Sequence, residues 1–457
     1  MTDTVYDMVI LGAGSGGYAA ALRGAQLGLR VALIEADKIG GTCLHRGCVP
    51  TKAILHSAET AEAVREAAAV GVRAAYQGLD MPAVQRYKNG VISRMYKGLQ
   101  GLVASRGIEV VGGWGRLLAR DTVEVSGRRY RGRNIVLASG SLSKTMGQEI
   151  SGPVMTSDQV LELDHVPASA VVLGGGVIGV ELASAWASMG SQVTIIEALP
   201  HLVPNEDEAI SKQLERAFRK RRIAFRTSTM FESVERTAAG VTVRTADGRT
   251  HDAEVLLIAV GRGPATANLG YEEVGVAMDR GFVLTDDYGR TNVEGVWAVG
   301  DIVPGVQLAH RGFAQGITVA EKIAGLDPRP VDDALVPKVT FCEPEIASVG
   351  LSEARAAELH GAENVTTSEF NVAGNAKSQI LGTQGFVKLV SLKDGPIVGF
   401  HAIGARMGEQ VGEGQLIVSW EADAHDVASL VHAHPTQNET IGEAAMVLAG
   451  KPLHNHG

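Results

Sequence analysis

The chain has 457 residues, more than one hydrophobic core usually organises, which favours about two to four domains. With 45% apolar and 20% charged residues, it has the composition of a folded globular protein and not of a disordered chain. The 42 basic and 51 acidic residues give a net charge of −9, which disfavours binding to nucleic-acid phosphates.

Cysteine usage and the start of the chain indicate the compartment. There are three cysteines, fewer than a secreted protein of this length normally carries. The first residues, MTDT, lack the basic and apolar regions of a signal peptide, and no apolar stretch reaches the roughly 18 residues of a transmembrane helix. We therefore expect a cytoplasmic protein without a membrane segment.

Glycine is unusually frequent, with 56 residues or about 12% of the chain against about 7% on average. Part of the excess belongs to a long-range repeat, because residues 9–36 match residues 171–198 at a constant offset of 162. Each copy has an apolar run, a glycine-rich turn, an alanine-rich helical pattern and a second apolar run that ends in an acid. This pattern is typical of a dinucleotide-binding βαβ unit. The matching positions are Gly12, Gly14, Gly17 and Glu35 in the first copy and Gly174, Gly176, Gly179 and Glu197 in the second.

The repeat predicts two nucleotide sites. In such a unit the glycines allow a tight turn, close approach of the backbone to a pyrophosphate, and close packing of helix on strand. The acid accepts hydrogen bonds from a ribose and repels a 2′-phosphate, so Glu197 favours NAD over NADP. One isolated motif is as often a packing feature, but two copies with matched acids indicate one flavin and one nicotinamide dinucleotide. The glycines do not decide which copy takes which.

The segment after the first copy, residues 40–52, holds Cys43 and Cys48. On a regular helix, five positions give about 7.5 Å of rise and some 140° of rotation, too far for the roughly 4.4–6.8 Å Cα separation of a disulfide. A bridge therefore needs a distorted turn, which the nearby glycines, Gly47 among them, allow. Pro50 suits the first turn of a helix beyond, whose N-terminus would help to lower a thiol pKa.

The main interpretation of this segment is a redox pair. The alternatives are two unrelated buried cysteines, or a zinc site with His45, for which no fourth ligand has a matching spacing. The third cysteine, Cys342, has no partner and is expected to be a small buried residue.

The rest of the chain predicts further α/β structure. Helical patterns cover 53–71 and 88–105, and short apolar runs typical of strands cover 134–140, 255–261 and 295–301. From about residue 335, strands such as 386–392 and 397–403 alternate with amphipathic helices, and no glycine fingerprint occurs. The predicted fold is α/β, with two Rossmann-like domains and an α+β C-terminal domain. The expected boundaries are 1–145, 146–265 for the second nucleotide domain, 266–334 for a central segment, and 335–457.

Near the C-terminus, residues 432–439 include His432, His434 and Glu439. A histidine oriented by a carboxylate is a standard acid-base arrangement, and thiol chemistry at neutral pH needs such a base. Taken alone, His434 is more often an ordinary surface or core histidine, and nothing more is expected of His425 and His432.

Together these residues resemble a known family, the pyridine nucleotide-disulfide oxidoreductases, and within it the branch that oxidises dihydrolipoamide. The resemblance runs from Asp7 to about Gly450. It is carried by the double glycine fingerprint and by four motifs in the family's order: GGTCLHRGCVPTK, TNVEGVWAVGD, FCEPEIASVGL and HAHPTQNE.

The resemblance implies roles for individual residues. The first copy would hold FAD, with Asp301 on the ribityl chain, and the second copy would hold NAD. Cys43 would be the interchange thiol and Cys48 the thiol that faces the flavin, with His434 and Glu439 as the base and its partner, supplied by the other subunit of a homodimer. Lys52 would lie near the flavin and pair with Glu181, whose alternative is an ordinary helix-surface acid. Further cofactor contacts would come from Gly115, Gly140, Leu308, Ala309, His310 and, for NAD, Gly261.

The implied reaction is oxidation of dihydrolipoamide to lipoamide, with a hydride passed to NAD. The implied partners are the lipoyl-bearing E2 or H-protein of 2-oxoacid dehydrogenase or glycine cleavage complexes, with no nucleic acid, membrane or metal. The chain departs from the common motifs at His45, at Thr51, at Gln437-Asn438 and at 262–265. We interpret these departures as tuning, with His45 a candidate to alter thiol pKa values. The alternative is another disulfide or metal-ion reductase of the family, similar to glutathione or mercuric reductase.

Overall fold

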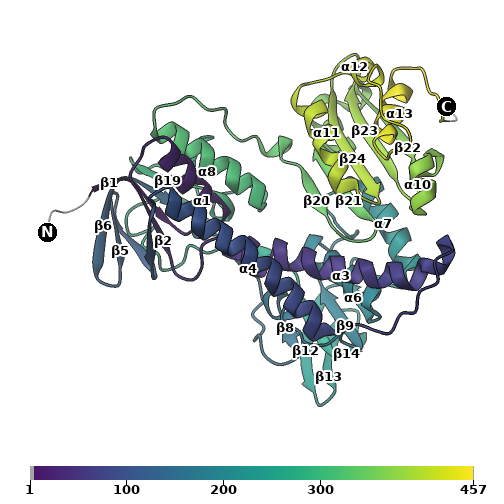
Figure 1. Cartoon of the computed structure of the whole chain (residues 1–457), viewed down its shortest axis with the longest axis horizontal. Coiled ribbons are helices and arrows are strands. Elements are labelled where there is room, and N and C mark those ends of the chain that lie inside the picture. Colours follow the sequence, from purple (N-terminus) through teal and green to yellow (C-terminus); the bar gives the residue numbers. More distant parts are fainter. Residues whose placement is uncertain (1–4, 456–457) are drawn as a thin grey trace. The chain divides into compact units, whose positions relative to one another are not determined.

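The computed structural model describes residues 5–455 (Figure 1). The chain divides into two compact units, each built from three segments. The first unit comprises the chain up to Ile54, Pro82–Lys144 and Gly261–Asp333. The second comprises Leu55–Met81, Thr145–Val260 and the chain from Ala334 onward. Each glycine repeat therefore lies in a different unit.

The first unit is built on a mainly parallel sheet. Its parallel strands are, in spatial order, β3 (Glu109–Gly112), β2 (Val31–Glu35), β1 (Val5–Leu11), β6 (Arg128–Leu137) and β19 (Val296–Ala298). Two antiparallel strands, β5 (Thr122–Val125) and β4 (Gly115–Ala119), extend the sheet from the first half of β6. A small ribbon is formed by β7 (Ser141–Ser143) and β16 (Arg262–Pro264), and another by β17 (Met278–Asp279) and β18 (Phe282–Val283). Strand β1 lies in the middle of the parallel strands, and the first glycine turn follows its last residue, Leu11.

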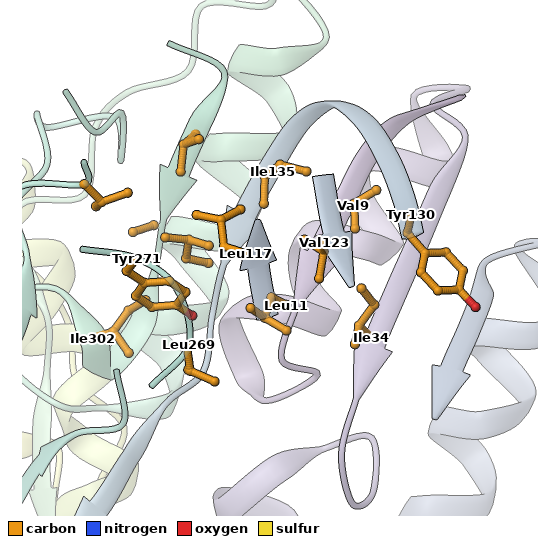
Figure 2. Close-up of a cluster of buried hydrophobic side chains, with 14 of the residues drawn as sticks. Val9, Leu11, Ile34, Leu117, Val123, Tyr130, Ile135, Leu269, Tyr271 and Ile302 are labelled. Carbon is orange, nitrogen blue, oxygen red and sulfur yellow. The ribbon is translucent and has the colours of Figure 1, made fainter. Parts of the chain in front are cut away.

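Both faces of this sheet are buried, which explains why its strands are continuous apolar runs. On β1, Val9 and Leu11 belong to one hydrophobic cluster, whereas Met8 and Ile10 belong to a second cluster on the opposite face. Figure 2 shows the first cluster, in which Tyr271 packs with side chains from the strands. In the second cluster, residues of α1 and α8 pack against the strand residues.

Two helices far apart in the sequence lie side by side on this sheet, α1 (Ser15–Gln26) and α8 (Ala309–Ile323) (Figure 1). Glycines allow the contact, because a Cβ at Gly316 would lie 2.2 Å from the backbone oxygen of Gly16. A Cβ at Gly312 would lie 3.1 Å from Oγ of Ser15, so the first turns of the two helices are adjacent. Their positive N-terminal ends therefore meet on one side of the sheet.

The second unit contains the second repeat in an all-parallel sheet. Its strands are, in spatial order, β11 (Ala224–Arg226), β10 (Gln192–Ile196), β9 (Ser169–Leu173), β15 (Val255–Ile258) and β8 (Val154–Met155). The accompanying helices are α5 (Ser157–Val160), α6 (Val177–Met189) and α7 (Glu208–Lys220). A separate antiparallel sheet contains β12 (Phe231–Thr237), β13 (Gly240–Thr245) and β14 (Thr250–Ala253).

The C-terminal part of the second unit is an antiparallel sheet with helices, which confirms the predicted α+β architecture. The strand order is β20 (Lys338–Thr340), β21 (Glu345–Gly350), β24 (Ile397–Gly404), β23 (Phe386–Leu392) and β22 (Val365–Asn371). The helices are α9 (Glu353–His360), α10 (Ala376–Leu381), α11 (Met407–Ser419), α12 (Ala424–Ala428) and α13 (Glu439–Leu448). Figure 1 shows α11, α12 and α13 around this sheet.

Two predicted helices begin earlier than expected. The helix expected at 53–71 is α3 (Cys48–Glu66), followed by a 3-10 turn at Ala67–Val70. The helix expected at 88–105 is α4 (Met81–Ser105), in which Pro82 occupies the first turn. Proline at that position is a helix-start signal that marks the true beginning. Within residues 5–455, no helix is both long and apolar enough to cross a membrane.

A buried ion pair joins the start of α7 to the C-terminal sheet. Nζ of Lys388 on β23 lies 2.8 Å from Oδ1 of Asp207 and 2.7 Å from Oε2 of Glu353. Lys388 is 6% exposed and Asp207 2% exposed. Asp207 also caps α7 by accepting the amide of Ala209 and accepts the amide of Glu353 through its other oxygen. Although burial opposes ionisation, the bonds from Lys388 and Glu353 hold the pKa of Asp207 below its usual value.

Substitution of this lysine is expected to weaken the second unit. Lys388→Met leaves the buried carboxylate of Asp207 without its cation, which costs about 3–5 kcal/mol in comparable buried pairs. We expect a clear fall in the calorimetric melting temperature. Lys212→Met, which breaks the exposed pair with Glu208, is the control and should change stability by less than about 1 kcal/mol. Equal effects of the two variants would contradict a special role for the buried pair.

Candidate active site

The first glycine turn has the geometry that the motif predicts. Gly12 adopts φ +106°, and a Cβ there would lie 2.3 Å from the backbone oxygen of Ala138. A Cβ at Gly17 would lie 1.8 Å from the backbone oxygen of Gly12, so α1 packs on the turn with no room for a side chain. At Gly14, by contrast, a Cβ would meet nothing within 4 Å. The first and third glycines therefore serve packing, and the second faces open space.

The second turn repeats this geometry. Gly174 adopts φ +100°, and its Cβ would lie 2.5 Å from the oxygen of Ala259. A Cβ at Gly179 would lie 1.9 Å from the oxygen of Gly174, whereas Gly176 has open space. The duplication seen in the sequence is thus a duplication of backbone conformation.

The two acids also occupy equivalent places, and both bind backbone amides. Glu35 accepts from Ala13 N at 2.7 Å and from Asp37 N at 2.9 Å. Glu197 accepts from Gly175 N at 2.6 Å and from Leu199 N at 2.7 Å. Each carboxylate therefore braces its own turn, a role beyond the predicted hydrogen bonds to a ribose. Each oxygen retains a lone pair that a ribose hydroxyl can use.

These turns fit two dinucleotides. A pyrophosphate needs a backbone that it can approach and free amides at a helix N-terminus, which Gly14 with α1 and Gly176 with α6 provide.

Further predicted cofactor residues lie near the ends of strands and at the start of α8. Asp301 follows β19 and accepts a 2.5 Å hydrogen bond from Ser141, which itself accepts from Nε of Arg262 at 2.8 Å. Gly115 is a packing glycine, because its Cβ would lie 2.4 Å from Leu11. Gly140 and Gly261 have positive φ, and Leu308, Ala309 and His310 form the start of α8.

The cysteine segment contains the break that a redox pair requires. Cys43 lies on α2 (Gly41–Arg46) and Cys48 is the first residue of α3, with Gly47 between them at φ −139° and ψ −110°. Pro50 lies in the first turn of α3, as predicted. The two cysteines are free thiols whose side chains are hydrogen-bonded to each other.

Ionisation of the two thiols is coupled. The hydrogen bond from Cys48, followed by burial and by the charge of Cys48, raises the pKa of Cys43, whereas Lys52 opposes the shift. A thiolate on one sulfur therefore suppresses ionisation of the other, which suits a pair that passes between a dithiol and a disulfide. The Lys52 cation lies close enough to influence this equilibrium.

Sequence reasoning missed Tyr18, which lies beside the pair. Burial, and then the charges of Cys43 and Cys48, raise the pKa of Tyr18 to about 12, so its hydroxyl stays neutral. Its ring is tilted against Phe313 of α8, with centroids 5.4 Å apart. Tyr18 follows Gly17 in the first turn of α1. This position next to the glycine motif could have identified it from the sequence.

His45 lies between the two cysteines in sequence and contacts the backbone just before α2. Its Nε2 lies 2.9 Å from the backbone oxygen of Ile39, and its ring packs edge-on against Tyr96 at 4.9 Å. The largest effects of charge on the Cys43 thiol come from Cys48 and Lys52. An effect of His45 on the thiols stays a prediction.

Two other predicted residues are buried. Glu181 on α6 is 2% exposed and accepts the amide of Phe341 at 2.9 Å, so the alternative of a helix-surface acid is wrong. Cys342 is also 2% exposed, as expected, and burial raises the pKa of its thiol well above the usual value.

His434 and Glu439, the predicted base and its partner, are hydrogen-bonded to each other. Nδ1 of His434 lies 2.7 Å from Oε1 of Glu439, whose other oxygen accepts the amide of Thr436 at 2.7 Å. Burial favours a neutral Glu439, but the bonds from Thr436 and His434 outweigh it and lower the pKa of this carboxyl. The histidine side chain is 72% exposed, so Nε2 is available to a substrate or to another chain.

The fold and the site define a class of protein. A family model described as pyridine nucleotide-disulphide oxidoreductase matches residues 6–316, and a model for the dimerisation domain of that family matches residues 336–445. The chain therefore belongs to the pyridine nucleotide-disulphide oxidoreductase family. It is an enzyme of that class, its C-terminal domain is a dimerisation domain, and the family supports a homodimer.

Two bacterial relatives, both dihydrolipoyl dehydrogenases, match nearly the whole chain. The chain is 37% identical to a dihydrolipoyl dehydrogenase of Bacillus subtilis, over 99% of both chains. It is 36% identical to that of Geobacillus stearothermophilus, over 98% of this chain and 97% of the relative.

Among solved structures, LpdA from Mycobacterium tuberculosis matches with a TM-score of 0.90 and 27% identity, over 96% of this chain and 99% of that one. The flavoprotein disulfide reductase RclA from Escherichia coli matches with a TM-score of 0.87 and 27% identity, over 97% of this chain and 100% of that one. FAD and NAD are the cofactors that this family and the two turns assign.

The cysteines should differ sharply in reactivity. In native, reduced protein, iodoacetamide should label the exposed Cys48 but leave Cys342 unmodified, because a buried, protonated thiol is a poor nucleophile. Peptide mass spectrometry before and after urea unfolding measures this. Rapid labelling of Cys342 in the folded protein would contradict its burial.

Proposed function

We propose that this protein oxidises dihydrolipoamide to lipoamide and reduces NAD through FAD. The observation that carries the proposal is the contact between the Cys43 and Cys48 thiols at a broken helix, in a chain 37% identical over 99% of its length to a dihydrolipoyl dehydrogenase. The first glycine turn precedes the cysteine segment in the same unit, which supports it as the FAD turn. The second turn, with Glu197, is then the NAD turn.

Individual cofactor contacts follow from this assignment. On the FAD side, the open backbone at Gly14 would receive the pyrophosphate, Glu35 the ribose and Asp301 the ribityl chain, with the start of α8 near the flavin. On the NAD side, Gly176 and Glu197 would have the equivalent roles, with Gly261 nearby. Lys52 would lie near the flavin, with Glu181 as its predicted partner. When bound, FAD would take up the electron pair of the dithiol and supply it to NAD as a hydride.

The chain's own residues carry the thiol chemistry. His434 of the partner subunit removes a proton from one thiol of dihydrolipoamide, and the resulting thiolate attacks Cys43 of the disulfide, releasing Cys48 as a thiolate. The imidazolium releases this first proton to solvent and then takes the proton of the second substrate thiol, whose sulfur displaces Cys43 as lipoamide closes its own disulfide. The imidazolium passes the second proton to the departing Cys43 sulfur. The products are lipoamide and the reduced pair with one thiol and one thiolate. Glu439 holds the imidazole in position and stabilises its protonated form.

The partner of such an enzyme is a lipoyl-bearing protein, the E2 component or the H-protein of a 2-oxoacid dehydrogenase or glycine cleavage complex, in the cytoplasm. The second candidate is another disulfide or metal-ion reductase, favoured by the structural match to RclA. We rank it lower because that match has 27% identity against 37% for the dihydrolipoyl dehydrogenase.

Substrate comparison tests the function. The purified flavoprotein should reduce NAD with dihydrolipoamide far faster than it oxidises NADPH with glutathione disulfide or Hg(II). His434→Gln should slow the dihydrolipoamide reaction by about 10²–10⁴-fold, because the base is lost. Oxidation of NADH by an artificial electron acceptor needs no thiol base and should remain near the original rate. Equal loss of both activities would show that His434 is not the base.

A second substitution tests which turn binds NAD. Gly176→Val should fold, since this position has open space and no positive φ, but its side chain occupies the place of the pyrophosphate. We expect a yellow protein with full flavin content and at least about a tenfold higher KM for NAD. The matched variant Gly14→Val should instead lose flavin. Loss of flavin in Gly176→Val would reverse the assignment of the two turns.

A further inference from the structure

A second histidine–glutamate pair lies beside the pair formed by His434 and Glu439. Nε2 of His432 lies 2.8 Å from Oε1 of Glu413 on α11. The other oxygen of Glu413 accepts a hydrogen bond from the side-chain amide of Asn438, the residue that precedes α13. The side chain of His432 is 12% exposed and that of Glu413 25% exposed, so the pair is largely shielded from solvent.

The ring of His432 is fixed against the helix that carries Glu439. A Cβ at Gly442 would lie 2.6 Å from Nδ1 of His432, so the imidazole packs directly on the backbone of α13. Gly442 and Glu439 are three residues apart and lie on the same side of this helix. Glu439 is therefore bonded to His434 on one side and faces His432 on the other.

The charges that act on His432 are those of Glu413 from α11 and Glu439 from α13, and Glu439 is itself paired with His434. The hydrogen bond to Glu413 raises the pKa of His432 against the effect of burial, and the charges of Glu413 and Glu439 add to it. His432 is consequently a cation over a wider pH range than an ordinary histidine. The negative charge of Glu439 is then shared between two imidazoles.

We propose that His432, held by Glu413 and Asn438, is a positioning residue that sets the basicity of the neighbouring pair of His434 and Glu439. A cation beside Glu439 reduces the attraction that this carboxylate exerts on a proton at His434. His434 therefore sheds the proton it has taken from a thiol at a lower pH than it would with Glu439 alone. The proposal rests on the assignment of His434 as the base of the proposed function.

The test is a proton titration of His434 in the holoenzyme, which requires no substrate. The His434 signal in ¹³C-histidine NMR is assigned with His434→Gln and followed against pH. His432→Gln removes the neighbouring cation, so the titration midpoint should move to higher pH, by about half a unit.

Two further variants separate charge from packing. His432→Lys keeps a cation near Glu413 and should leave the midpoint within about 0.2 units of the original. The control is His425→Gln on α12, an exposed histidine that should change nothing. If His432→Gln leaves the midpoint where it was, or if His432→Lys shifts it equally, the ring is only a packing element and the proposal is wrong.

The rate of the thiol reaction gives a separate readout. With dihydrolipoamide, the acid limb of the kcat/KM profile should move with the NMR midpoint in His432→Gln, while NADH oxidation by an artificial acceptor keeps its profile. An inactive wild type would overturn the proposed function, yet the NMR midpoints would still decide the role of His432. An acid limb that stays fixed while the midpoint moves would show that His432 acts on His434 but not on the reaction.

Discussion

The structure depends on one close contact, the approach of the third glycine of each turn to the backbone oxygen of the first. A Cβ at Gly17 would lie 1.8 Å from the oxygen of Gly12, and one at Gly179 would lie 1.9 Å from that of Gly174. There is no space for a side chain, so the helix begins directly against the strand. This contact aims the helix N-terminus at the open side of the turn. The acid at the end of the second strand then braces the turn through backbone amides.

The cysteine pair and the proposed base are held in place by different kinds of contact. The cysteine pair is positioned by local backbone features, a helix break at Gly47 and a helix start at Cys48, so its geometry belongs to a short segment. The base is positioned by tertiary contacts, since Glu439 begins α13 and its neighbours come from the preceding loop and from α11. Thiol reactivity is thus encoded within a few residues, whereas basicity depends on how α11 and α13 pack together.

The sequence predicted the parts of the molecule that follow from local rules. Strand, turn and helix of both repeats, the distorted turn between Cys43 and Cys48, and the burial of Cys342 could all be inferred from residue type and spacing. The contact of His434 with Glu439 followed from the family resemblance. Helix starts at Cys48 and Met81 were placed too late, because apolar periodicity is weak there and capping decides the boundary.

Long-range contacts could not be predicted. Glu413 lies 19 residues from His432 and on another helix, and no periodicity links the two. Tyr18 reaches the cysteines only because α1 and the cysteine segment fold onto the same side of the first turn. Nor did the sequence indicate that the ring of His45 contacts the carbonyl of Ile39 and the ring of Tyr96.

The contact between α1 and α8 affects the order in which the two nucleotide sheets can be completed during synthesis. The first unit gains its last parallel strand, β19, and its helix α8 only after residue 295, although its glycine turn is complete near residue 17. The parallel sheet of the second repeat needs nothing beyond residue 258. During synthesis from the N-terminus, the later repeat can therefore complete its sheet while the earlier one still waits for its missing strand.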